Sequence, residues 1–203
     1  MDRVERIESR ASRQLDEADR ILVLTIRADV ARLRGANDTA LRFAEEAVKL
    51  DPGLRTSAHM RAVIQVVDCL MAVDRDREAL RTANAAIETL LERGLITDAA
   101  LLLERCALLI ARDGEGVRAA QMFACMEETL RRSQRVGLRF DREIEAKLQD
   151  EISMRVSPEA IVAAFAAGRR LGITGATSLT NATNRPRKLA GKLGFLKKRG
   201  DAF

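Results

Sequence analysis

Three segments of the chain share one arrangement of small residues, and this arrangement sets how closely their helices can pack. Residues 35–52, 74–90 and 114–130 each open on a turn residue, followed after five, nine and twelve positions by small or apolar residues. In the first segment these residues are Ala40, Ala44 and Ala47. Three- and four-residue spacing places them on one face of a helix. Side chains this small predict that a second helix approaches that face closely.

A second amphipathic segment precedes each of these three, at residues 18–34, 57–73 and 98–113. Its apolar residues recur at three and four positions, which is typical of a helix with one buried face. The period is therefore helix, tight turn, helix, with units 39 and 40 residues apart. One such hairpin cannot bury its apolar face alone, whereas three stacked hairpins form a continuous core. The sequence thus predicts an all-α chain, a short solenoid of antiparallel helix hairpins with an N-terminal helix.

The matched positions resemble the tetratricopeptide repeat. That family places a large and a small residue on the first helix, glycine at the turn, small residues on the second helix and proline after it. The first unit fills these positions with Leu24, Ala28, Gly35, Ala40, Ala44, Ala47 and Pro52. The second has Val63, Val67, Asp74, Ala79, Ala83 and Ala86, and the third has Leu103, Ala107, Gly114, Ala119, Phe123 and Met126. The family's aromatics are missing, and the period exceeds the usual ~34 residues, so residues 18–134 are tetratricopeptide-like.

A closing helix pair is expected after the third unit. Residues 137–155 form one helical segment, and Ser157 followed by Pro158 is a favourable start for another over 159–172, which ends on a glycine. This region is similar to the C-terminal repeat region of large bacterial regulators, which join a signal-transduction ATPase to a LuxR-type helix-turn-helix or a nucleotide cyclase domain. The matching residues are Phe123, Glu127, Phe165, Gly168, Arg169 and Leu171. The resemblance implies a sensing or interaction region in bacterial signalling or transcriptional regulation.

We expect no catalytic activity, no metal and no cofactor. The chain has no GxxxxGK[ST] loop to hold phosphates, and about 30 residues after Leu171 are too few for a helix-turn-helix domain. The chain is therefore interpreted as a stand-alone relative or a remnant of a larger regulator. The one histidine, His59, is interpreted as an ordinary residue at a helix start. The adjacent carboxylates Glu45–Glu46 and Glu127–Glu128 do not face each other on a helix, which favours a solvated face.

Two regions follow from the charge distribution, a tetratricopeptide-like domain at 1–172 and a flexible basic tail at 173–203. Of 35 Lys and Arg and 30 Asp and Glu, residues 185–203 hold seven and one, which leaves 28 and 29 in the rest. The stretch 172–184 has the composition of a flexible linker. The basic residues of the tail are Arg185, Arg187, Lys188, Lys192, Lys197, Lys198 and Arg199. They suit an anionic membrane or nucleic acid, and a disordered, solubilising tail is the alternative.

The expected partner is a protein or peptide on the concave face formed by the first helices of the hairpins. The polar positions proposed for it are Arg27, Arg61, Gln65 and Arg105. The charged N-terminus has no apolar run behind it, and three cysteines without a CxxC suit a reducing compartment as small buried thiols. We therefore expect a cytoplasmic protein, whose oligomeric state the sequence leaves open.

Overall fold

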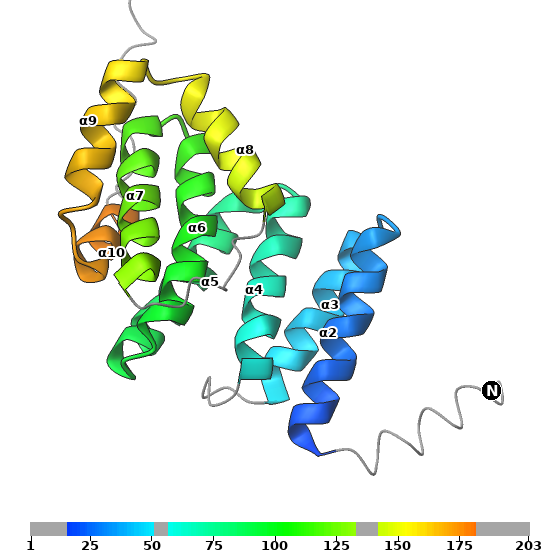
Figure 1. The fold of residues 1–203 in the computed structure, drawn as a ribbon. Coiled ribbons are helices and arrows are strands. Elements are labelled where there is room, and N and C mark those ends of the chain that lie inside the picture. The colour runs from blue at the N-terminus through cyan, green and yellow to red at the C-terminus, as the bar shows by residue number, and fades with distance from the viewer. Residues whose placement is uncertain (1–15, 51–56, 133–141, 182–203) are drawn as a thin grey trace, which may run out of the picture.

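A computed structural model describes residues 16–50, 57–132 and 142–181, and these residues form helices joined by turns. Figure 1 shows them side by side, with α2 and α3 at one end and α9 and α10 at the other. The helices are α2 (Glu17–Leu33), α3 (Asn37–Leu50), α4 (Ser57–Ala72), α5 (Asp76–Glu92), α6 (Ile96–Arg112), α7 (Gly116–Arg132), α8 (Arg142–Ser153), α9 (Pro158–Gly168) and α10 (Ile173–Asn181). The all-α prediction is confirmed for this part of the chain.

The first six of these helices match the segments expected from the sequence to within two residues at each end. The segments 18–34, 57–73 and 98–113 become α2, α4 and α6, and the alanine-containing segments become α3, α5 and α7. The helix α3 ends at Leu50, and the Asp51–Pro52 pair expected to end it lies outside the described residues.

The turn residues have the left-handed backbone that the pattern requires. The φ angles are 73° at Gly35, 56° at Asp74 and 91° at Gly114. The next residue's N–H donates back to the carbonyl oxygen five positions earlier, as in Arg75 to Leu70 at 2.9 Å. This hydrogen bond satisfies a carbonyl at the helix end and reverses the chain within two residues.

Asp74 is expected to show the energetic cost of its positive φ. A residue with a Cβ in this conformation lowers the stability of the fold by about 1 kcal/mol. The loss is smaller for Asp and absent for Gly, which has no Cβ. Asp74→Gly should therefore leave stability unchanged or raise it by about 0.5 kcal/mol, whereas Asp74→Ala should lower it by about 1 kcal/mol. Urea unfolding of the two variants measures the difference, and equal midpoints for both would contradict this explanation.

Neighbouring helices pack in two ways. From α2 to α7, each helix packs on the next helix along the chain. The alternate helices also form a row, in which α2 contacts α4, α4 contacts α6 and α6 contacts α8. All nine small or apolar positions of α3, α5 and α7 are buried: Ala40, Ala44, Ala47, Ala79, Ala83, Ala86, Ala119, Phe123 and Met126. The close helix contact predicted from the small residues is thereby confirmed.

The helix α6 is largely buried beyond its first turn. It packs against α5, α7, α8 and α10, with further contacts to α4, and twelve of its seventeen residues are buried. The helix α9 packs against α7, and the rings of Phe123 and Phe165 meet there edge to face with their centroids 5.9 Å apart. Ser157 caps α9 by accepting the Ala160 N–H, as its sequence predicts.

The C-terminal part of the described chain differs from expectation. The helix α9 ends at Gly168 rather than at Gly172. Residues 173–181, within the stretch interpreted as a flexible linker, form α10, which packs against α5, α6 and α7. Ala176 and Thr180 of α10 are buried, so the linker prediction is wrong for these residues. The basic residues from Arg185 onward lie outside the described part of the chain.

Candidate functional site

A pocket of about 530 Å³ opens where three segments distant in sequence meet. The turn from α5 into α6 contributes one wall, the last turn of α7 a second, and the junction between α9 and α10 the third. Its lining residues are Gly94, Leu95, Ile96, Thr97, Asp98, Glu128, Thr129, Arg132, Leu171, Gly172 and Ile173. The pocket therefore depends on α10, the helix that the sequence did not predict.

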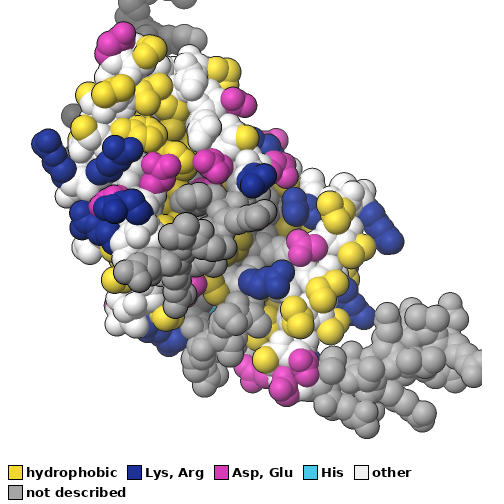
Figure 2. All heavy atoms as spheres, viewed as in Figure 1, with side chains coloured by type: hydrophobic (Ala, Val, Ile, Leu, Met, Phe, Trp, Pro, Cys, Tyr) yellow, Lys and Arg dark blue, Asp and Glu magenta, His cyan; other side chains and the backbone are white. Residues whose placement is uncertain are grey.

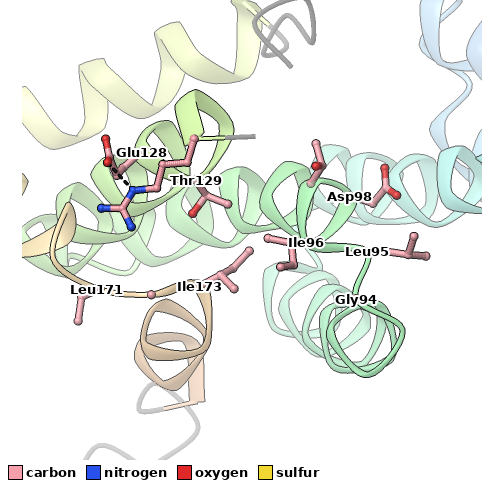
Figure 3. Close-up of a pocket in the computed structure, with 11 residues that line it drawn as sticks. Gly94, Leu95, Ile96, Asp98, Glu128, Thr129, Leu171 and Ile173 are labelled. Carbon is pink, nitrogen blue, oxygen red and sulfur yellow. Dashed lines mark hydrogen bonds and ion pairs between the residues drawn. The ribbon is translucent and has the colours of Figure 1, made fainter. Parts of the chain in front are cut away.

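Apolar side chains form the interior of this pocket. Figure 3 shows Ile96 and Ile173 facing each other across it, with Thr129 on α7 above Ile173 in this view. Leu95 is 40% exposed and Ile96 is 46% exposed, although both are large and apolar. The Thr129 hydroxyl donates to its own helix, at the Cys125 carbonyl oxygen. The site consequently offers branched apolar surface to a ligand and few free polar groups.

Charged residues stand at the edge of the pocket. Glu128 accepts hydrogen bonds from Arg131 and Arg132, and its carboxylate oxygen lies 2.6 Å from Nε of Arg132. These two guanidinium groups lower the pKa of Glu128 to about 2, so the carboxylate stays ionised at physiological pH. Asp98 adds a further acid in the first turn of α6. The rim is thus polar and charged around an apolar centre, as in many pockets that bind side chains.

The structure places Gln65 and Arg105 in the interior rather than on an exposed face. Gln65 is 6% exposed, and its Nε2 donates to Asp29 Oδ1 of α2 at 2.5 Å. Arg105 is 5% exposed and donates to Asp68 of α4, with Nε 3.2 Å from Oδ1. The expectation that Gln65 and Arg105 are exposed to a partner on the concave face is wrong, because each side chain joins its helix to the helix two before it.

The same contact recurs at the repeat spacing. Asp29 and Asp68 are 39 residues apart, and Gln65 and Arg105 are 40 apart. An acid on one helix therefore meets a donor on the next helix of the row at both joints, α2 to α4 and α4 to α6. At the second joint, Arg105 also binds the fully buried Glu104 at 2.8 Å.

The other two proposed partner-binding residues lie apart from the pocket. Arg61 is exposed on α4. Arg27 on α2 is half-buried, with its guanidinium carbon 6.0 Å from the centre of the Phe43 ring, a cation–π distance. The four predicted residues thus do not form one site, and their part in binding stays a prediction.

The cysteines are buried and free, as expected. Burial, with the Asp68 carboxylate second, raises the pKa of Cys69 to about 11. Burial alone raises the pKa of Cys106 to about 12, and it also raises that of Cys125. These thiols are therefore protonated and poorly reactive near neutral pH. His59, in the first turn of α4, is buried as well.

Glu127 and its neighbour Glu128 have different surroundings. Burial raises the pKa of Glu127, and the nearby Arg169 guanidinium opposes this.

Within the described ranges no group of three or more His, Cys, Asp and Glu is placed to hold a metal ion. In the same residues, no helix combines the length and the hydropathy needed to cross a membrane.

One wall of the pocket could have been found from the sequence, but the helical periodicity drew attention away from it. Leu95 and Ile96 directly follow Gly94, where residues at a turn are ordinarily polar. Two large apolar side chains beside a turn glycine indicate an exposed apolar position. The opposite wall, from Leu171 to Ile173, could not be paired with them without the position of α10.

Comparison with known proteins adds no relative. No protein-family model matches the chain, and the searches of curated proteins and of solved structures found no match.

Proposed function

We propose that this chain is a non-catalytic protein-interaction module of tetratricopeptide-like helix hairpins, stacked as a short solenoid, in bacterial signalling or transcriptional regulation. The repeat part of the proposal is supported by equivalent residues 39 and 40 positions apart that have the same turn conformation and the same burial. The recurring contact between acid and donor joins successive first helices in the same way. The regulatory setting rests on the resemblance of the closing helices.

The observation that carries the interaction function is the apolar pocket between α6, α7 and α10. Leu95 and Ile96 are 40% and 46% exposed, so a partner that covered them would gain part of the ~1.5–3 kcal/mol that full burial of such a side chain contributes. The pocket lining also includes the charged Arg132–Glu128 pair, so the pocket suits an apolar side chain of a peptide whose backbone stays near the polar edge. The binding surface proposed is therefore this pocket, with Ile96 and Ile173 as its contact residues.

Ile96→Asp is expected to abolish capture of the partner from nuclease-treated cytosol. A carboxylate at this position would be desolvated when a peptide side chain enters, which weakens binding by about tenfold or more. Val117→Asp is the matched control, since Val117 is 45% exposed in the first turn of α7 and lies outside the pocket lining. A bait ending at Thr183 tests whether the basic residues from Arg185 onward are needed.

A protein captured equally by the full chain, by the truncated bait and by Val117→Asp, but lost with Ile96→Asp, supports the pocket. Capture that survives Ile96→Asp contradicts it. Capture seen only with the full chain, and lost at moderate salt, would instead assign the function to the basic residues 185–199 and an anionic partner.

A further inference from the structure

The helix α2 carries an exposed apolar stripe along its length. Leu22, Ile26, Val30 and Leu33 are 39%, 52%, 40% and 80% exposed, and their spacing of four, four and three residues places them on one side of the helix. Figure 2 shows hydrophobic side chains gathered over the α2–α3 pair, at the lower right of the view. No helix among the described residues packs on this side of α2.

Repeat equivalence identifies this side as a helix-docking face. Ile26 and Val30 stand 39 residues before Gln65 and Cys69, and these stand 40 residues before Arg105 and Leu109. In α4 and α6 these positions are 0–6% exposed. There they face the preceding helix of the row, as the Gln65–Asp29 and Arg105–Asp68 contacts show. The face that α4 and α6 bury is therefore open in α2.

The residue types on the open face differ from those at the internal joints. Gln65 and Arg105 are donors that each meet an acid of the preceding helix. Their equivalent in α2 is Ile26, which makes no such contact. At the centre of a symmetric interface a residue meets its own copy, which two isoleucines do favourably and two arginines do not.

The charges along α2 are distributed unevenly. Its N-terminal end carries three acids, Asp16, Glu17 and Asp19, against the single base Arg20, and its C-terminal end carries Arg32 and Arg34 against the single acid Asp29. In an antiparallel pair centred on Ile26, Leu22 of one copy lies opposite Val30 of the other. Residues whose numbers add to 52 lie opposite each other in this register, so Asp19 of one copy lies opposite Leu33 of the other and beside the next residue, Arg34. Opposite charges thus flank the apolar contact at both ends, whereas a parallel pair would set like charges together.

We propose that two copies of this chain associate through α2, packed antiparallel about a twofold axis that passes near Ile26. Two whole chains related in this way bury the stripe of each α2 and pair the acidic end of one helix with the basic end of the other. The surface is separate from the pocket between α6, α7 and α10, so both can be occupied together.

The full-length chain is expected to show a dimer mass by light scattering after size exclusion, between about 1 and about 100 µM. Ile26→Asp should raise the dimer dissociation constant at least about tenfold, because it places two carboxylates at the axis. Val162→Asp, at a position 70% exposed on α9, is the control and should leave the mass unchanged. A monomeric wild-type chain, or a dimer that survives Ile26→Asp, would overturn the proposal.

Charge exchange tests the antiparallel arrangement. Asp19→Arg and Arg34→Asp should each weaken the dimer, and the double variant should restore it, since the two ends have merely exchanged signs. Failure of the double variant to recover would exclude this register. Removal of residues 1–15 provides the last comparison: a dimer that forms only in the shortened chain would show that this segment covers the stripe, and would also overturn the proposal.

Discussion

The Gly168→Ala variant is expected to lose about 3 kcal/mol of stability, at the upper end of the cost of an overpacked contact. Gly168 is buried where α9 crosses α7. A Cβ built there would overlap the Gln121 carbonyl oxygen and lie 2.9 Å from the Ala124 Cβ. Both neighbours belong to the body of α7, so the added methyl group can be accommodated only by moving one helix away from the other.

Such a movement should also separate the Phe123 and Phe165 rings, which meet between the same two helices. Thermal unfolding measures the effect, and a fall in Tm of roughly 10 °C is expected. Gly172→Ala is the matched control, because Gly172 is exposed and a Cβ there meets nothing within 4 Å. That variant should stay within about 0.5 kcal/mol of wild type. Equal stabilities for the two variants would mean that α9 does not pack on α7 as described.

The Arg105→Ala variant is expected to be destabilised by a similar amount, about 3 kcal/mol. Its guanidinium joins α6 to Asp68 of α4 and binds Glu104, whose side chain is fully buried. Removal of the cation takes from the buried Glu104 and the half-buried Asp68 the opposite charge that Arg105 supplies, and loss of one partner of a buried ion pair is costly. The loss should appear in urea unfolding as a lower midpoint with an unchanged slope.

Arg75→Ala is the comparison for Arg105→Ala. Arg75 also forms a close ion pair, 2.7 Å from Glu78, but both side chains are 40% exposed or more. An exposed pair contributes ~0.2–1 kcal/mol, so this variant should change little. If Arg105→Ala were as mild as Arg75→Ala, the contact between α4 and α6 would not depend on the buried ion pair.

The helices and their close packing could be predicted because they depend on local pattern. The size and spacing of Ala40, Ala44 and Ala47 alone predict a closely packed neighbouring helix. Gly35 and Gly114 mark turns that need a residue with left-handed backbone. Such features repeat every 39 or 40 residues, so each unit supported the interpretation of the others.

The helix α10 could not be predicted, because its own sequence does not favour a helix. Thr, Ser and Gly are weak helix formers, and its hydroxyls bond back to carbonyls of the same helix, as Thr180 does to Thr177. Tertiary contacts hold it instead: Ala176 is buried, and Arg118 of α7 donates to the Leu179 carbonyl oxygen. Without α10, the pocket that it completes could not be predicted either.

The burial of Gln65 and Arg105 was missed for a related reason. A polar residue on a helix is ordinarily exposed, and only the neighbouring helices decide otherwise. The acids that receive them, Asp29 and Asp68, are 36 and 37 residues away in sequence. The pairing is visible only when the helices are placed in their row.

The measurement that tests the proposed interaction most directly is hydrogen exchange of the chain with and without its captured partner. The pocket predicts slower exchange on binding in residues 93–99, at the start of α6, and in residues 171–176, at the start of α10. The slowing of exchange should be large in α10, since a short helix held by tertiary contacts opens readily when no partner is bound. Unchanged exchange in both segments, with slowing confined to other parts of the chain, would contradict the account.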